Sequence, residues 1–239
     1  MSRQDWIRII TLIAAALVIG HAQAAQPAPA PAPAPAPGAA AAVAAVHPPL
    51  LFREAWRQPS HTGELTDENR RLTPEAVSNP TLKLTLYGAD SRNIGVYSHE
   101  GRLDLWTGMT TSPVAVTLSD KGNYIDLSVP LARVRWTTRT QSLHVIHPVV
   151  KLADGMLLVG SHGVSTEGEF LLNEVTFANQ RWFKLDPVKL VTTVMVDKPD
   201  LSRVDEIGFV DLMPAGGHGN AGWVNVSALE VYAGTRPRQ

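Results

Sequence analysis

Short segments of alternating hydrophobic and polar residues fill the chain from Leu50 to its end. Other segments are rich in β-branched residues, and both patterns are typical of β-strands. Long runs of apolar residues at helical spacing do not occur, although a single helical turn could begin at 73–76. The predicted strands are Leu82–Tyr87, Ile94–Tyr97, Val114–Leu118, Tyr124–Leu127, Arg133–Thr138, Val145–Leu152, Leu157–Gly160, Glu169–Phe177, Arg181–Leu185, Val191–Val196, Val204–Leu212 and Val224–Tyr232.

The turns between these segments favour antiparallel pairing. Asp154 and Gly155 follow the segment 145–152, and a two-residue Asp-Gly turn of type I′ would join it to 157–160 as a hairpin. Around ten short strands at this spacing indicate two packed sheets. The sequence therefore predicts an all-β fold, a single two-sheet antiparallel β-sandwich of the jelly-roll kind, over residues 50–239.

A glycine-rich loop joins the last two predicted strands. It contains Gly216, Gly217, His218, Gly219, Asn220, Gly222 and Trp223. Glycines would let a ligand approach the backbone, where His218 and Asn220 could supply hydrogen bonds. The alternative is a tight connection that needs positive φ angles. The loop is not a phosphate loop, because it lacks the Lys-Ser/Thr ending and a following helix.

The first 24 residues have the three parts of an export signal. Arg3 and Arg8 flank its start, and 9–19 is apolar. Residues 22–24, Ala-Gln-Ala, match the small-x-small pattern of a cleavage site. The apolar run is shorter than the roughly 20 residues that cross a bilayer, so we expect no transmembrane segment after cleavage. The protein is therefore expected to be periplasmic or extracellular.

Residues 25–49 form an Ala/Pro-rich segment before the predicted domain. Proline and alanine alternate from Pro27 to Pro37, which favours an extended polyproline II chain without internal hydrogen bonds. We expect this segment to be a disordered, semi-rigid linker. The predicted organisation is a signal peptide over 1–24, the linker over 25–49, and the folded domain over 50–239.

The overall charge and the lack of cysteine exclude several classes of function. The chain has 21 basic and 22 acidic residues. Removing the signal takes away Arg3, Arg8 and Asp5, which leaves 19 basic and 21 acidic residues and a net charge of −2. Nucleic-acid partners need clustered positive charge, so none is expected. Without cysteine the chain has no disulfide, thiolate nucleophile or cysteine-ligated zinc.

The predicted strand that begins at residue 133 alternates strictly, which would place a basic stripe on one face. Arg133, Arg135 and Arg139 point to one side. Val134 and Trp136 point to the other. Guanidinium groups bind carboxylates in a two-point manner, so the stripe could hold an acidic sugar. The alternative is an ordinary solvent-facing sheet, neutralised by acidic residues on neighbouring strands.

The tryptophans divide into core and loop candidates. Trp136 and Trp182 lie inside strand patterns and are expected in the core. Trp106 and Trp223 lie nearer loops, where exposed rings can stack on sugar faces. Burial of these two rings is the alternative, because large aromatic residues dominate β-sandwich cores. The candidate ligand-binding residues are Arg133, Arg135, Arg139, Trp106, His218, Asn220 and Trp223.

Histidine spacing gives little indication of a metal site. His144 and His147 are three residues apart in or near a strand, which sends their side chains to opposite faces. We expect no cofactor, apart from a structural calcium ion that Glu54 and Glu230 could bind together if the first and last strands pair.

No catalytic signature stands out among the carboxylates. A retaining glycosidase needs two carboxylates about 5 Å apart. Glu167 and Glu169 are the same-face pair of their strand region, and carboxylates from distant strands could also meet. The enzyme interpretation is therefore the weaker alternative, and no catalytic residue is assigned.

Three segments of the C-terminal half resemble the galactose-binding-like jelly rolls, in particular those of the carbohydrate-binding-module type. They are 179–185 with its Trp182, the approach to the penultimate strand at 200–209, and the closing strand at 226–232. The domain also resembles secreted bacterial proteins that have no assigned activity. The first resemblance implies non-catalytic glycan binding, often with calcium, and transfers no ligand residue to this chain.

Together these features predict an exported, non-catalytic module that binds a glycan or another ligand of the cell envelope. The arginine stripe makes an acidic polysaccharide the finer expectation. One alternative is a structural or protein-interaction protein of the envelope, favoured if neighbouring acidic residues neutralise the stripe. The other is a glycoside hydrolase or lyase, favoured if two carboxylates converge in a cleft.

Overall fold

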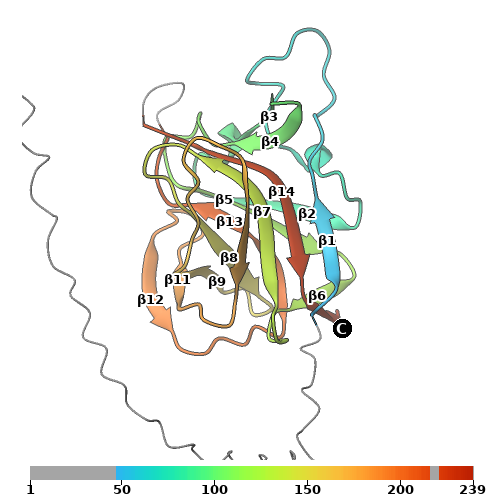
Figure 1. Cartoon of the computed structure of the whole chain (residues 1–239), viewed down its shortest axis with the longest axis vertical. Coiled ribbons are helices and arrows are strands. Elements are labelled where there is room, and N and C mark those ends of the chain that lie inside the picture. The colour runs from blue at the N-terminus through green and yellow to red at the C-terminus, as the bar shows by residue number, and fades with distance from the viewer. Residues whose placement is uncertain (1–46, 216–220, 239) are drawn as a thin grey trace, which may run out of the picture. The chain divides into compact units, whose positions relative to one another are not determined.

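The computed structural model describes residues 47–215 and 221–238 (Figure 1). These residues form fifteen β-strands and two 3₁₀ turns, η1 (Pro74–Ala76) and η2 (Ser91–Asn93). The expected signal peptide and most of the expected linker lie outside the described residues and stay predictions. Within the described ranges, no helix is long and apolar enough to cross a membrane.

Sheet A has six strands, and its central strand is the last long strand of the chain. Its order is β10 (Leu171–Thr176), β7 (Arg133–Thr140), β14 (Val224–Tyr232), β4 (Arg102–Trp106) and β3 (Gly95–His99), with β1 (Leu50–Glu54) also paired to β14. One edge of β14 pairs with β7, and its other edge is shared by β4 and β1. Where the pairing of this edge changes from β4 to β1, Trp56 Nε1 donates a hydrogen bond of 3.0 Å to the Val226 carbonyl oxygen.

Sheet B has nine strands and packs against sheet A (Figure 1). Its main order is β12 (Thr192–Val196), β11 (Trp182–Leu185), β9 (Leu157–Gly160), β8 (Ile146–Leu152), β13 (Val204–Asp211), β5 (Val114–Asp120) and β2 (Leu82–Tyr87); β6 (Asn123–Asp126) pairs with β13 and with β15 (Gly234–Pro237). All the paired strands of both sheets are antiparallel, so the predicted all-β sandwich is confirmed.

The core lies between the two sheets and explains the alternation along β7. Val134 and Trp136 are fully buried in this core, whereas the arginines between them face outward and are partly exposed. Phe209 and Leu229 contribute to the same core from the two long C-terminal strands. Burying each such side chain contributes about 1.5–3 kcal/mol relative to leaving it in water. Apolar burial therefore fixes which way the arginines point.

The hairpin between β8 and β9 forms as expected, but its turn is not of the predicted type. The Gly155 amide donates to the Leu152 carbonyl oxygen at 2.9 Å, so Ala153 and Asp154 are the central residues of the turn. Of the turn residues, Gly155 has a positive φ, at 89°. A type I′ turn needs positive φ at both central residues, so this connection is a longer turn closed by a left-handed glycine.

A second hairpin, between β3 and β4, was not predicted. Glu100 and Gly101 form its tip with φ angles of 52° and 76°, the left-handed pair that a tight hairpin favours. Trp106, which the sequence placed near a loop, is the last residue of β4 and is 7% exposed. This hairpin positions most of the candidate site described below.

Candidate functional site

The outer face of sheet A carries the three arginines of the predicted stripe. Arg133, Arg135 and Arg139 have side-chain exposures of 15%, 31% and 19%. Directly paired residues of neighbouring strands share a face, so the register places Glu174 of β10 and Glu230 of β14 beside Arg135. The predicted common face of the arginines is therefore present, and it includes carboxylates from both neighbouring strands.

The charges at one end of this face satisfy one another. Arg133 Nε lies 3.0 Å from a Glu174 carboxylate oxygen, and its guanidinium carbon lies 4.1 Å from the centre of the Tyr232 ring. Arg135 lies 3.7 Å from Glu174 and 3.8 Å from Glu230. We call these five residues the charged end of the face. Its arginines are largely neutralised before any ligand arrives.

Arg139 connects this face to the tip of the β3–β4 hairpin. Its Nη1 lies 3.8 Å from a Glu100 carboxylate oxygen, and its Nε donates to Asn225 Oδ1 at 3.3 Å. The guanidinium carbons of Arg139 and Arg102 each lie 4.9 Å from the centre of the Phe170 ring. The hairpin tip therefore reaches residues of the β7 and β10 side, and Phe170 packs against both guanidinium groups.

A buried carboxylate anchors the base of the hairpin. Asp104 is fully buried, and its Oδ1 accepts a hydrogen bond of 2.6 Å from Asn225 Nδ2. Its Oδ2 lies 2.8 Å from His99 Nδ1. Burial raises the pKa of Asp104, although the bonds from Asn225 and His99 act in the opposite direction. His99 is partly exposed, and its Nε2 makes no hydrogen bond to the part of the chain that the structure describes.

Three aromatic rings lie together at the same end as this hairpin. Tyr97 and Trp106 meet edge to face with ring centres 4.8 Å apart, and Trp106 and Trp223 do so at 6.2 Å. Trp106 is buried, while Tyr97 and Trp223 are partly exposed. Gly108 lies against Trp106 so closely that an added Cβ would be 2.0 Å from the ring. The cluster therefore has one buried ring and two rings with accessible surface.

The phenol of Tyr97 is held in place by a loop residue. Its hydroxyl donates to Asp67 Oδ1 at 2.7 Å, and the guanidinium carbon of Arg70 lies 4.7 Å from the ring centre. Burial and the carboxylate of Asp67 raise the pKa of Tyr97, so it stays a protonated donor.

The structure brings together part of the predicted site. We call Tyr97, His99, Arg102, Trp106 and Trp223 the aromatic end of the face. Two of the predicted residues, Trp106 and Trp223, belong to it. Arg133 and Arg135 belong to the charged end, and Arg139 lies between the two ends.

Some members of the site were missed or fall outside the structure. His218 and Asn220 lie outside the described residues, so their predicted role stays a prediction. Tyr97, His99 and Arg102 were not proposed from the sequence, although the strict alternation of 102–106, Arg-Leu-Asp-Leu-Trp, is a strand signal that could have located β4.

The structure does not bring the proposed calcium ligands together. The first and last long strands do pair, but Glu54 is adjacent to the residue opposite Glu230, so the two side chains lie on opposite faces. Glu54 is fully buried and accepts hydrogen bonds from the Trp56, Ser78 and Asn79 amides at 2.7–3.0 Å. Across the described residues, no group of three His, Asp or Glu side chains is arranged to hold a metal ion.

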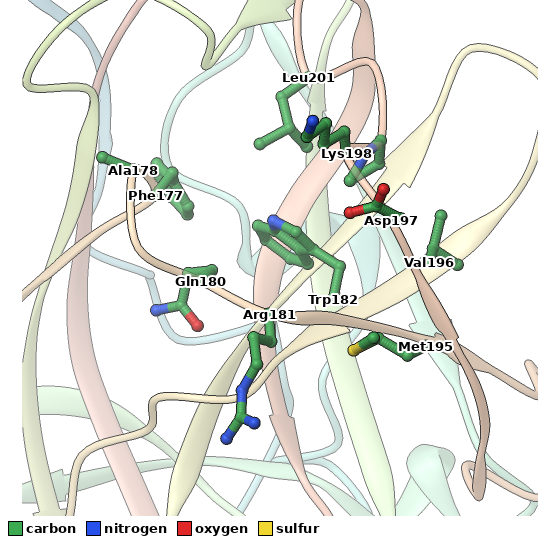
Figure 2. Close-up of a pocket in the computed structure, with 11 residues that line it drawn as sticks. Phe177, Ala178, Gln180, Arg181, Trp182, Met195, Val196, Asp197, Lys198 and Leu201 are labelled. Atoms are coloured by element: carbon green, nitrogen blue, oxygen red, sulfur yellow. The ribbon is translucent and has the colours of Figure 1, made fainter.

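A separate pocket of about 260 Å³ opens at the side of the sandwich, beside β11 and β12 (Figure 2). Phe177 and Trp182 lie at its base with ring centres 6.3 Å apart, and each is 3% exposed, so Trp182 is a core residue as predicted. Figure 2 shows the Arg181 guanidinium directed away from Trp182, with Lys198 on the other side of the ring. The pocket therefore offers little aromatic surface, and its cations do not converge.

Comparisons with known proteins find solved structures of low sequence identity and low TM-score. No family model and no curated protein matches the chain. The fold is similar to a family 11 carbohydrate-binding module of a Clostridium thermocellum cellulase, with 12% identity, 67% of this chain and 88% of that chain covered, and a TM-score of 0.37.

Two further solved structures have comparable values. A family 29 carbohydrate-binding module complexed with cellulohexaose has 13% identity, 65% and 94% coverage of the two chains, and a TM-score of 0.35. Arcelin-5, a lectin-like defence protein of Phaseolus vulgaris, has 11% identity, 66% and 95% coverage, and a TM-score of 0.36. The structural neighbours of this chain thus include carbohydrate-binding modules and a lectin-like protein.

Proposed function

We propose that this protein binds a glycan, without chemical conversion, at the aromatic end of sheet A. The observation that carries the proposal is the grouping of partly exposed Tyr97 and Trp223 with the hydrogen-bonding groups of His99 and Arg102. Sugar rings pack their C–H groups on aromatic surfaces, and their hydroxyls bond to fixed polar side chains. His99 is fixed in this way by the buried Asp104.

Arg102 is the residue that supports an acidic glycan. The arginines of the charged end each lie within 3.8 Å of a carboxylate. Arg102 is exposed, packs on Phe170, and has no carboxylate partner among the described residues. A uronic acid carboxylate could therefore pair with Arg102 without displacing an existing partner.

The state of the nearby carboxylates supports a non-catalytic role. Glycoside hydrolysis needs two carboxylates on either side of the scissile bond. Asp104 is fully buried and bonded to Asn225 and His99, and Glu100 lies beside Arg139. The carboxylates beside the aromatic end therefore each have a partner within the protein, including Asp67, which accepts a hydrogen bond from the Tyr97 hydroxyl.

Titration of the full chain with two glycans of equal length tests the proposal. Cellohexaose and hexagalacturonate differ in carboxylates, so calorimetry with both separates glycan binding from acid recognition. We expect Trp223→Ala to weaken either interaction by about tenfold or more, because an aromatic platform contributes roughly 1–3 kcal/mol. Tyr232→Ala at the charged end is the matched control. Equal losses in both variants, or no binding by the wild type, would contradict the proposal.

A protein-interaction role is the second candidate, and a different observation favours it. Leu171 and Leu172 are 50% and 56% exposed on β10, the edge strand of sheet A. Edge strands with exposed apolar residues can pair with another chain, and the neutralised charged end beside them would not oppose it. Leu172→Lys should abolish any self-association seen by sedimentation, and should leave glycan affinity unchanged.

A further inference from the structure

A buried histidine and aspartate adjoin the aromatic end. His144 follows β7 and Asp211 ends β13, and both side chains are fully buried. His144 Nδ1 lies 2.8 Å from Asp211 Oδ2. A buried ionisable pair of this kind is costly to desolvate unless every polar atom has a partner, so its partners decide what it does.

Both ring nitrogens of His144 face oxygen atoms that can accept a hydrogen bond. Nε2 lies 3.2 Å from the Ala221 carbonyl oxygen, which accepts and cannot donate a hydrogen bond. Nδ1 faces the Asp211 carboxylate, which accepts when it is ionised. This geometry therefore satisfies both ring nitrogens only when each carries a proton.

Hydrogen bonds connect this pair to the residues that follow Trp106 and Trp223 in the sequence. Thr107 Oγ1 donates to Asp211 Oδ2 at 3.3 Å and accepts from the Val224 amide at 3.0 Å. Thr107 directly follows Trp106, and Val224 directly follows Trp223. The Thr107 hydroxyl thus links the Asp211 carboxylate to the backbone next to both tryptophans.

Close packing transmits the position of the His144 ring to the segment before Trp223. Gly222 has a φ of 92°, and a Cβ added there would lie 2.8 Å from His144 Cδ2. Ala221, which accepts the hydrogen bond from the ring, precedes this glycine. A displacement of the ring therefore moves residues 221–223, because no space separates them.

A second histidine lies within the electrostatic reach of this pair. His147 on β8 feels the charge of Asp211, but burial lowers the pKa of His147, and its Nδ1 lies 3.1 Å from the Gly160 carbonyl oxygen. Burial also lowers the pKa of His144, but the hydrogen bond and charge of Asp211 and the bond to Ala221 outweigh it, so the net pKa is raised. The pKa values of the two histidines are therefore shifted in opposite directions.

We propose that His144 and Asp211 form a proton-dependent latch that positions Trp106 and Trp223, so that glycan binding at the aromatic end depends on pH. The ligand part of this inference rests on the proposed function, whereas the latch itself does not. Loss of the proton leaves a nitrogen lone pair against either the Ala221 carbonyl or the Asp211 carboxylate. This contact is repulsive, and the segment that carries Trp223 is released from the ring.

The raised pKa of His144 sets the direction of the effect. A group whose pKa is higher in the folded state than in the unfolded state stabilises the fold fully below the unfolded value, here about 6.5. The stabilisation is lost as the pH rises through the folded value. The latch is therefore closed in mildly acidic solution and opens as the pH rises above the folded-state pKa of His144.

The first test needs no ligand. In the full-length wild type, nitrogen NMR should show both ring nitrogens of His144 protonated at pH 6, and the indole N–H signal of Trp223 should shift with the same midpoint as His144. In His144→Gln, which cannot titrate, the indole signal should not follow pH. Asp211→Asn is the second variant, and it should lower the midpoint of His144. An indole signal that ignores the His144 titration in the wild type overturns the latch.

The second test adds the ligand and separates the two proposals. Affinity for cellohexaose and hexagalacturonate should fall with rising pH, by about tenfold for each unit by which binding shifts the pKa of the pair. The dependence should disappear in His144→Gln and persist in His99→Gln, which replaces the histidine of the site itself. A dependence that disappears in His99→Gln and persists in His144→Gln overturns the inference. Absence of binding at every pH, with the indole still following His144, overturns the proposed function and leaves the latch standing.

Discussion

The two ends of the outer face of sheet A use polar groups in different ways. At the charged end, Arg133 and Arg135 meet Glu174 and Glu230 across neighbouring strands, so exposed charges satisfy one another. At the aromatic end, a buried carboxylate holds its partners and leaves their outer surfaces accessible, as with His99. A charged residue of the sequence is therefore available to a ligand only if its neighbours in the fold leave it unpaired.

Removing the buried carboxylate should have the largest effect. Asp104→Ala leaves the Asn225 amide buried without its acceptor and His99 without its partner. We expect the free energy of unfolding to fall by about 2–4 kcal/mol, because unpaired buried polar groups keep their full desolvation cost. Urea denaturation measures this value. A loss below about 1 kcal/mol would mean that the aromatic end does not depend on Asp104.

Crowding the buried ring should have the next largest effect. Gly108→Ala introduces a Cβ that would overlap the Trp106 ring, which Tyr97 and Trp223 contact from other directions. We expect a loss of about 1–3 kcal/mol in unfolding free energy and weaker glycan binding. Gly122→Ala is the control, because its nearest neighbour would lie 3.5 Å away. Equal stability of the two variants would show that the ring can move without cost.

Replacing one arginine at each end compares the contributions of the two ends to glycan affinity. Arg102→Ala should weaken hexagalacturonate binding by about tenfold, the value of one charge-assisted hydrogen bond, with little change for cellohexaose. Arg135→Ala should change both affinities less, because its guanidinium already has Glu174 and Glu230 beside it. Calorimetry on the two variants checks this order. The reverse order would return the acid-binding role to the predicted stripe.

Removing a carboxylate from the charged end should have the smallest effect on stability. Glu174 is about half exposed, and exposed ion pairs contribute roughly 0–1 kcal/mol. Glu174→Ala should therefore leave the unfolding free energy almost unchanged. It should raise hexagalacturonate affinity slightly, because Arg133 and Arg135 lose a partner. An unchanged affinity would show that the charged end contributes nothing to acid recognition.

The sequence predicted the orientation of the stripe but not its neutralisation. Strict alternation in 133–140 decides which side chains face the core, and this depends on local pattern alone. The partners Glu174 and Glu230 lie about 40 and 95 residues away, and their positions depend on strand pairing. Local pattern therefore predicts a face, whereas pairing between distant strands decides its charge.

The aromatic end was predicted in part for a similar reason. Trp106 and Trp223 lie near predicted loops, and the strands predicted from the sequence do not include 102–106. Without β4 there was no hairpin to bring His99 and Arg102 to the same surface. The buried acceptor Glu54 was equally hard to foresee, because three of its donors belong to loop backbone amides and not to a side-chain motif.

The pairing of β1 with β14 sets the distance between the point where the chain enters the fold and the aromatic end. Leu50 pairs with Tyr232, so the chain enters the folded domain at the charged end of the face. Trp106 pairs with Asn225, seven positions earlier on β14, and at about 3.3 Å per residue this end lies roughly 20 Å away. Along β14, the point where the chain enters the described fold and the aromatic end therefore lie at opposite ends of the same face.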